Sequence, residues 1–130
     1  MSELDAILSR LRNGPGGTLN VYDSAPTNPA TPYVIVYAGA GIRDSDREAD
    51  VRVRRTIDFN TITVGSSPAQ CRAALSRVMD ALEDWTPIVE GRACSKVEHP
   101  VSRPMFKDDS LPDRVVYTAP DQWSTVSNPA

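Results

Sequence analysis

Apolar and polar positions alternate with two different periods along this chain, so the sequence predicts a mixture of helices and strands. The first element reads as a short helix, because its apolar residues share one face at helical spacing: Leu4, Ile7, Leu8 and Leu11. Ser2 precedes this face and is placed to cap the helix. The glycine-rich run of residues 13–17 is expected to end it.

A second helix is specified more strongly. Residues 67–70 read Ser-Pro-Ala-Gln, which is the pattern of a capping box with proline at the first helical position. The residues predicted to share the buried face are Cys71, Ala74, Leu75, Val78, Met79, Leu82 and Trp85. We expect Thr86-Pro87 to end this helix.

Strands are predicted around residues 19–22 and 33–37. The second run is short and wholly apolar or aromatic, which favours a strand that is buried on both faces or lies near the centre of a sheet. From residue 51 to 59 apolar residues occupy odd positions, as in a strand with one wet face. The parity reverses beyond Asn60, and this reversal predicts a bulge there.

The C-terminal part predicts two more strands, each interrupted by proline. Within residues 93–106, Pro100 and Pro104 favour an edge strand or a bulge. The last strand is expected over residues 114–126, with a bend or bulge at Pro120. We therefore predict one α+β domain over residues 1–130. It has a mixed, mostly antiparallel sheet of about four to five strands, with both helices on one face.

Charge and composition narrow the possible function classes. The chain has 130 residues, 14 Lys and Arg against 17 Asp and Glu, and a formal net charge of −3. A nucleic-acid binder usually has a basic excess, so sequence-specific nucleic-acid binding is disfavoured. No apolar run has the length of a membrane span. The acidic N-terminus lacks the positive charge of a signal peptide, so we expect synthesis in the cytoplasm.

The residues that carry chemistry do not form a recognisable catalytic or metal-binding pattern. His99 is the one histidine, and it lies beside Pro100 without a nucleophile motif, so we interpret it as a surface or structural residue. Cys71 and Cys94 are too far apart for a CxxC metal pair. We expect no enzyme activity, cofactor or metal.

Further residues carry a resemblance to a known family. They follow the order of the expected elements and lie at residues 21–23, 32–36, 61–65, 67–87, 91–92, 102–104, 108–109 and 116–123. With these residues and its length, the chain resembles the tail terminator proteins of long-tailed bacteriophages, especially those that infect actinobacteria. The resemblance covers nearly the whole chain and consists of structural residues, without a catalytic signature.

This resemblance implies a structural virion protein. Such subunits form a ring, typically a hexamer, that caps the tail tube, stops tube polymerisation and offers its other face to the connector of the head. The implied partners are further copies of the chain, the tail tube protein and a head-completion or connector protein, with no membrane. The implied place is the virion tail at the head–tail junction, after assembly in the host cytoplasm.

Two other functions remain open at this point. One is another small virion part, such as a head–tail connector, head-completion or minor tail protein. A less favoured one is a small ligand-binding protein or enzyme that holds an acidic ligand through its arginines.

A charged segment supplies the candidate contact residues for the ring. Charges of both signs stand side by side from residue 43 to 50, and two arginines of one strand face follow them. We interpret this segment as a subunit or tube interface, and the alternative is a loop that is only solvated. The candidate residues are Arg43, Asp44, Asp46, Arg47, Glu48, Arg52 and Arg54.

Overall fold

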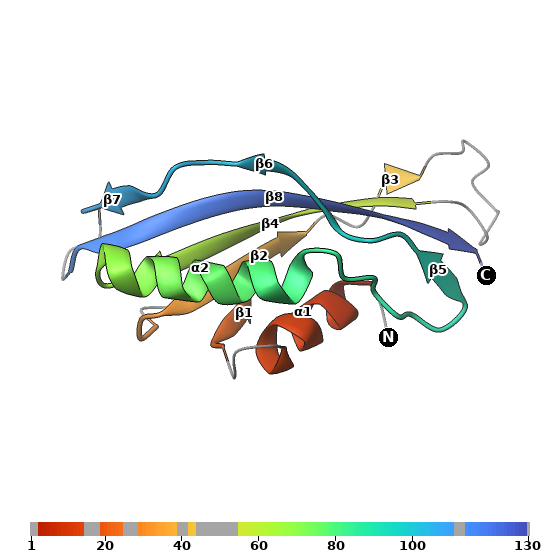
Figure 1. Ribbon diagram of the computed structural model, residues 1–130, viewed down its shortest axis with the longest axis horizontal. Coiled ribbons are helices and arrows are strands. Elements are labelled where there is room, and N and C mark those ends of the chain that lie inside the picture. The colour runs from red at the N-terminus through yellow and green to blue at the C-terminus, as the bar shows by residue number, and fades with distance from the viewer. Residues whose placement is uncertain are drawn as a thin grey trace.

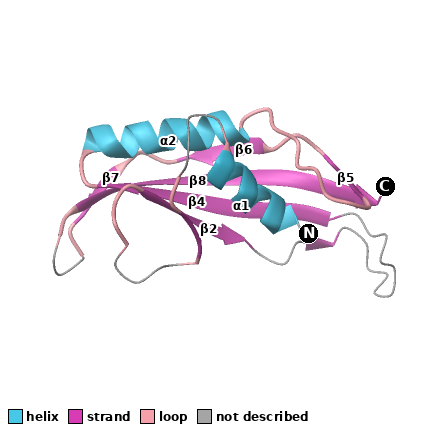
Figure 2. Ribbon diagram, turned by 90° about the horizontal axis from the view of Figure 1, so that it is seen from below, coloured by secondary structure: helices cyan, strands magenta, loops and turns pink. Residues whose placement is uncertain are grey.

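The computed structural model describes residues 3–14, 19–24, 29–38, 42–43, 55–110 and 114–129. Two helices, α1 (Glu3–Asn13) and α2 (Pro68–Leu82), lie on the same face of one sheet (Figures 1 and 2). The described strands are β1 (Val21–Asp23), β2 (Tyr33–Ala38), β3 (Ile42–Arg43), β4 (Arg55–Gly65), β5 (Arg92–Cys94), β6 (Glu98–Ser102), β7 (Phe106–Asp108) and β8 (Val116–Pro129).

The sheet is mixed and mostly antiparallel, as the sequence predicts. Its strand order is β1-β2-β4-β8-β5, while β3 lies beside β4 and both β6 and β7 lie beside β8. Only the β1–β2 pair is parallel among the described pairs. The α+β class and the placement of both helices on one face are therefore confirmed.

The two longest strands, β4 and β8, form the central ladder. Their residues pair one to one from Arg55 opposite Ser127 to Gly65 opposite Tyr117, without a register shift. The bulge predicted at Asn60 is therefore wrong. Beyond Asn60 the face of β4 toward the helices is still buried, but its residues are threonines, Thr61 and Thr63. Apolar residues now occupy the opposite face, so the apolar pattern changes from odd to even positions without a bulge.

Pro120 lies inside β8 and leaves its ladder with β4 in register, so the alternative of a bulge at Pro120 is wrong. Its carbonyl accepts a hydrogen bond from the backbone N–H of Arg103 at 3.3 Å. The ring nitrogen and the carbonyl of one residue point to the same side in an antiparallel ladder. Pro120 therefore turns its missing N–H toward the connection between β6 and β7, and β4 loses no hydrogen bond.

The strands next to β8 have the edge character that their prolines predict. Three short strands, β5, β6 and β7, share one side of β8, where the sequence predicted a single interrupted strand. The register of β6 shifts between Glu98 and Val101, on either side of Pro100. Proline has no N–H donor and therefore interrupts the pairing with β8. An edge of the sheet tolerates such an interruption, so the edge is divided into short strands.

Helix α1 forms where the apolar spacing predicts it. Ile7 and Leu11 of α1 are buried in the main core. A Cβ atom on Gly14 would lie 2.4 Å from the carbonyl oxygen of Arg10, so only glycine fits directly after the helix. The predicted cap, Ser2, lies outside the described residues.

Helix α2 begins as predicted, with a small change in the capping box. The Ser67 hydroxyl accepts a hydrogen bond from the backbone N–H of Gln70 at 3.1 Å. The Gln70 side chain reaches back to the backbone N–H of Ser66 at 2.6 Å, one residue before the cap. A Cβ atom on Gly65 would lie 2.5 Å from the backbone nitrogen of Cys71, so the first turn of α2 packs directly on the sheet.

Helix α2 ends earlier than predicted. Its last residue is Leu82, Glu83 is the C-cap, and Asp84 has a positive φ of 56°. A left-handed residue ends the helical hydrogen-bond pattern, and aspartate is one of the residues that tolerate this conformation. Trp85 therefore lies beyond the helix, and Thr86-Pro87 is not its stop signal.

The core has two parts, one on each side of the sheet. The main cluster lies between the helices and the sheet, and its largest fully buried side chains include Trp123, Phe59, Ile7, Leu11 and Leu82. The smaller cluster lies on the opposite side of the sheet and consists of Tyr33, Ile35, Val64 and Val116. Strand β2 contributes to both clusters, so the prediction that it is buried on both faces is confirmed.

Candidate functional site

The predicted interface segment is largely untested by the structure. Arg43 belongs to the short strand β3 and pairs with Arg55 of β4, where the sequence predicted a connection. The other candidates, Asp44, Asp46, Arg47, Glu48, Arg52 and Arg54, lie outside the described residues. Their role at a subunit or tube interface therefore stays a prediction.

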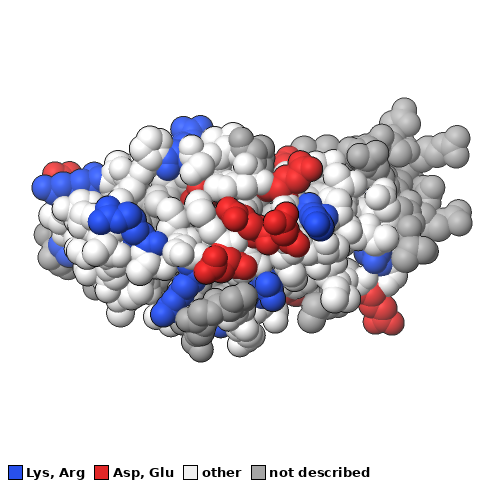
Figure 3. Space-filling view, viewed as in Figure 1, with Lys and Arg blue, Asp and Glu red and all other residues white. Residues whose placement is uncertain are grey.

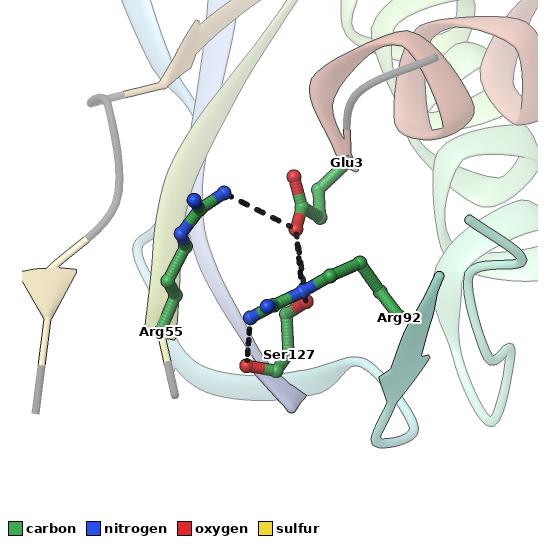
Figure 4. A network of polar contacts seen from close by, with 4 residues as sticks. All are labelled: Glu3, Arg55, Arg92 and Ser127. Atoms are coloured by element: carbon green, nitrogen blue, oxygen red, sulfur yellow. Dashed lines mark hydrogen bonds and ion pairs between the residues drawn. The ribbon is translucent and has the colours of Figure 1, made fainter. Parts of the chain in front are cut away.

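A polar network lies at the start of β4 (Figure 4). Oε1 of Glu3 accepts a hydrogen bond from the Ser127 hydroxyl at 2.8 Å, and it also lies 4.0 Å from Nη1 of Arg55 and 3.8 Å from Nε of Arg92. Arg92 donates to the Ser127 hydroxyl at 2.9 Å and to the Ser127 carbonyl at 2.7 Å. One carboxylate thus joins α1, β4, β5 and β8.

This carboxylate remains ionised despite its burial. Loss of water raises the pKa of Glu3, but hydrogen bonds from its own backbone N–H and from Ser127, together with the charges of Arg55 and Arg92, lower the pKa by more. The network therefore acts as a structural tie. The sequence indicates Glu3 as a first-turn acid, but it gives no signal for a partner as distant as Ser127.

His99 has a structural setting in the described part of the chain. Its Nε2 lies 2.8 Å from Oδ1 of Asp121, and its ring stacks on Trp123 with ring centres 4.0 Å apart. Trp123 in turn donates its indole N–H to the Thr61 hydroxyl at 2.9 Å. A histidine paired with an aspartate has two parts of a catalytic triad. Within the described ranges the hydrogen-bond partner of His99 is Asp121, and no serine or cysteine supplies the third part of a triad there.

The two cysteines do not form a reactive pair. Both are unbridged, and Cys71 is buried with its thiol 3.6 Å from the carbonyl oxygen of Thr63. Burial raises the pKa of the Cys71 thiol, which disfavours the reactive thiolate. Among the described residues no three side chains of the metal-ligating types converge. None of the described helices has the length and apolar character needed to cross a membrane.

A shallow groove lies between α1 and the segment that follows α2. Its volume is about 290 Å³, and its lining residues are Ala6, Ser9, Arg10, Asn13, Trp85 and Ile88. Arg10 donates to the carbonyl of Ala81 at 2.8 Å and lies over the Trp85 ring, 5.6 Å from its centre. Ile88 is 85% exposed at the side of this groove. A single exposed aliphatic side chain is common on protein surfaces and does not by itself indicate a binding site.

Charged side chains are distributed unevenly over the helix side of the molecule. Figure 3 shows a group of acidic side chains near the middle of this side of the molecule, with basic side chains distributed around it. The exposed acids of the first group are Asp80, Glu83 and Asp84. Among the bases, Arg72 near the start of α2 is exposed. Sequence reasoning did not single out either group, because charged residues on a helix surface usually indicate only solvation.

In its described part, the chain is an α+β domain without a recognisable metal-binding or catalytic cluster. Its sequence matches the family described as "Tail completion protein gp17" over residues 5–119, and the chain belongs to this family. It is therefore a structural protein of the bacteriophage tail and a component of the virion. The family predicted from the sequence is thus confirmed at this level.

Solved structures share the fold. A chain from a structure titled "Virion of native gene transfer agent (GTA) particle" matches with a TM-score of 0.60 and 18% sequence identity. The match covers 95% of this chain and 93% of that chain. At this identity the match shows a common fold over nearly the full length of both chains. Comparison with curated proteins finds no match.

Proposed function

We propose that this protein forms a ring of six subunits that caps the end of the tail tube. The ring stops tube polymerisation and offers its other face to a head-completion or connector protein. The observation that carries this proposal is the family match over residues 5–119, since a tail completion protein acts where the tail is finished. The fold shared with a chain of a virion structure supports it.

The surface of the subunit is suited to a closed ring. A cyclic ring needs two different, complementary surfaces on every copy, because each copy contacts its two neighbours in different ways. The described surface carries a group of acidic side chains on its helix side, with basic side chains around it (Figure 3). Charges of both signs are therefore available on this face for contacts with neighbouring copies.

The charged segment before β4 is proposed as a further contact, either with the neighbouring subunit or with the tube. Its residues are Arg43, Asp44, Asp46, Arg47, Glu48, Arg52 and Arg54. The polar network of Glu3 supports this assignment, because it anchors the start of β4 directly after the segment. Replacement of Arg52 and Arg54 by alanine is expected to weaken tube binding or ring formation without loss of folding.

The proposed action needs no catalysis, cofactor or metal, since a cap works by occupying the growing end. A tube-growth experiment tests it. Purified tail tube protein is allowed to polymerise with and without this protein, and tube lengths are measured by electron microscopy. Shorter tubes with a ring at one end are expected. Unchanged tube lengths together with binding to the head connector alone would instead identify a head-completion protein.

A further inference from the structure

The sheet has one face that neither described helix covers (Figure 2). Phe59 and Trp123 lie opposite each other in the β4–β8 ladder and belong to the main core, so the odd-numbered residues of both strands face the helices. Side chains alternate along a strand, and therefore Asn60 and Gln122 project to the other face. We call this side of the sheet the open face.

Exposed apolar side chains lie on the open face. Residues that are opposite each other in a ladder project to the same side of a sheet. Tyr37 of β2 lies opposite Asn60, and Val101 of β6 lies opposite Gln122. Phe106 of β7 lies opposite another even-numbered residue of β8. All three apolar side chains are at least 37% exposed, and several such residues on one face are typical of a protein contact surface.

A pocket opens in this face. Its volume is about 320 Å³, and its lining combines residues of β2, β4 and β8 with Arg103 of the segment after β6. Ile62 and Pro120 give the pocket apolar walls. Asp121 also lines it, but the carboxylate of Asp121 is 1% exposed and lies 2.8 Å from Nε2 of His99. Among the described lining residues, the accessible charge is therefore that of Arg103.

This lining suits an apolar side chain that is accompanied by a carboxylate. The apolar walls favour a side chain without polar atoms, because its burial removes apolar surface from water. The guanidinium of Arg103 can bind a carboxylate through two parallel hydrogen bonds. Asn60 and Gln122 add amide groups that can donate to and accept from the backbone of a partner. A basic partner is disfavoured, because its charge would face Arg103.

The segment after α2 presents such a pair of side chains. Ile88 and Glu90 are exposed on either side of the buried Val89, so both side chains project away from the core. Ile88 is the most exposed large hydrophobic residue of the described chain. The Val89 carbonyl accepts a hydrogen bond from the backbone N–H of Arg92 at 3.0 Å, which fixes Glu90 inside a turn. The isoleucine and the carboxylate are therefore presented together from a structured segment.

One subunit cannot bring this pair to its own pocket. Ile88 lies on the helix side of the sheet, because it lines a groove with Ala6 and Ser9 of α1. The pocket lies on the open face, so the sheet separates the two. A contact between them must join two copies of the chain. Such a contact uses a different surface on each copy, which is the head-to-tail arrangement that a closed ring requires.

We propose that the pocket of the open face receives Ile88 of a second copy of the chain, while Glu90 of that copy binds Arg103. This inference rests on the proposed ring and specifies its subunit interface. The isoleucine supplies the buried centre of the contact, and Tyr37 covers it from the side of β2. The ion pair guides the encounter and fixes the orientation of the two copies.

Charge exchange tests the ion pair. Self-association is measured by light scattering, with tail-tube ends added if rings form only on a tube. Arg103→Glu and Glu90→Arg are each expected to raise the dissociation constant about tenfold, because each places like charges at the contact. An equal mixture of the two variants is expected to restore association, since every contact then joins opposite charges. Arg72→Glu, an exposed reversal at the start of α2, is the control and is expected to change nothing.

Two exposed substitutions test the apolar part. Ile88→Ala removes the side chain that enters the pocket, and Asn60→Trp fills the pocket from its wall. Each is expected to raise the dissociation constant about tenfold or more. Urea unfolding is expected to be nearly unchanged, because both positions are exposed. If Asn60→Trp left self-association unchanged and abolished binding to tube ends, the pocket would be a tube contact, and the contact between copies would be overturned.

Disulfide trapping identifies the contact directly. Equal amounts of Ile88→Cys and Gln122→Cys are mixed and oxidised, and a disulfide-linked dimer is expected on a non-reducing gel. Arg72→Cys in place of Gln122→Cys is the control, since the native cysteines are common to both mixtures. Rings that persist in all variants and trap no dimer above the control would overturn the interface and leave the ring proposal intact. A wild-type protein that stays monomeric with tube ends present would overturn the ring, and the interface with it.

Discussion

The two helices of this protein use their charged residues in opposite ways. In α1 the acids Glu3 and Asp5 lie in the first turn and the bases Arg10 and Arg12 in the last, as the helix dipole favours. In α2 the exposed charges are reversed. Charged residues at both ends of α1 also make tertiary contacts, such as Glu3 with Ser127 and Arg10 with Ala81. Helix α2 is held by its N-cap and its buried face instead. The difference indicates that the charges of α1 serve the fold, whereas those of α2 do not stabilise their own helix.

The largest expected effect comes from removing the buried face of α2. Leu82 is fully buried in the core between α2 and the sheet. Leu82→Ala is expected to lower the free energy of unfolding by about 2–5 kcal/mol, because it removes apolar contacts and leaves a cavity. Urea unfolding followed by circular dichroism measures this change. Ile88→Ala is the exposed control, with an expected change within about 0.5 kcal/mol. Equal effects of the two variants would contradict the packing of α2.

The next effect concerns the anchor of α1. Glu3→Gln removes the charge that Arg55, Arg92 and Ser127 hold in Figure 4. A loss of about 1–3 kcal/mol is expected at neutral pH, the usual range for a buried hydrogen bond to a charged group. Glu98→Gln, an exposed substitution of the same kind, is the control.

The same carboxylate makes stability depend on pH. The pKa of Glu3 in the folded protein is lowered from its ordinary value of 4.5. Its contribution to stability is therefore complete above the unfolded pKa and is lost as the pH falls through the lower, folded pKa. Unfolding measured between pH 7 and pH 3 is expected to show the wild type and Glu3→Gln converging in acid. A constant difference over this range would mean that the charge of Glu3 does not contribute.

A smaller effect is expected at the start of α2. Ser67→Ala removes the hydroxyl that accepts the N–H of Gln70, and a loss of about 1 kcal/mol in the free energy of unfolding is expected. Ser76→Ala, on the exposed surface of the same helix, is the matched control and is expected to be neutral or slightly stabilising. If Ser67→Ala were equally neutral, the neighbouring Ser66–Gln70 contacts would have to supply the cap.

The elements that the sequence predicts well are those whose signals are local. The face of α1, the cap at Ser67 and the apolar run of β2 all depend on residues a few positions apart. The errors have long-range causes. No bulge is needed at Asn60, because Thr61 is buried beside Trp123, which is distant in sequence. Pro120 is tolerated because its backbone faces the β6–β7 connection.

The candidate site was harder to predict than the fold, for a related reason. The charged segment before β4 stands out in the sequence because its charges are consecutive. The groove beside α1 combines residues of α1 with residues beyond α2, which are distant in the sequence. It has no sequence motif. Ala6 and Ile88 line the same groove because α1 packs beside α2 and the segment that follows it.

The smallest expected effect on stability is that of Glu83→Lys, and it gives the most direct test of the difference between the two helices. Glu83→Lys places a positive charge at the C-terminal end of α2, where the helix dipole favours it, so the free energy of unfolding is expected to rise by about 0.3–1 kcal/mol at low salt. If this exposed acid contacts a neighbouring copy in the proposed ring, the same substitution is expected to weaken association of subunits. Thermal unfolding and light scattering on one sample measure both quantities.

Only a functional role for this acid gives opposite signs in these two measurements. If Glu83 served the fold, its replacement would lower stability, and association would change only through unfolding. If it were merely solvated, stability would rise slightly and association would not change. Salt provides the control, because both the dipole effect and the contact between copies are expected to weaken as ionic strength increases. A more stable monomer that assembles less well would therefore mean that α2 keeps an unfavourable charge at its end for the benefit of the ring.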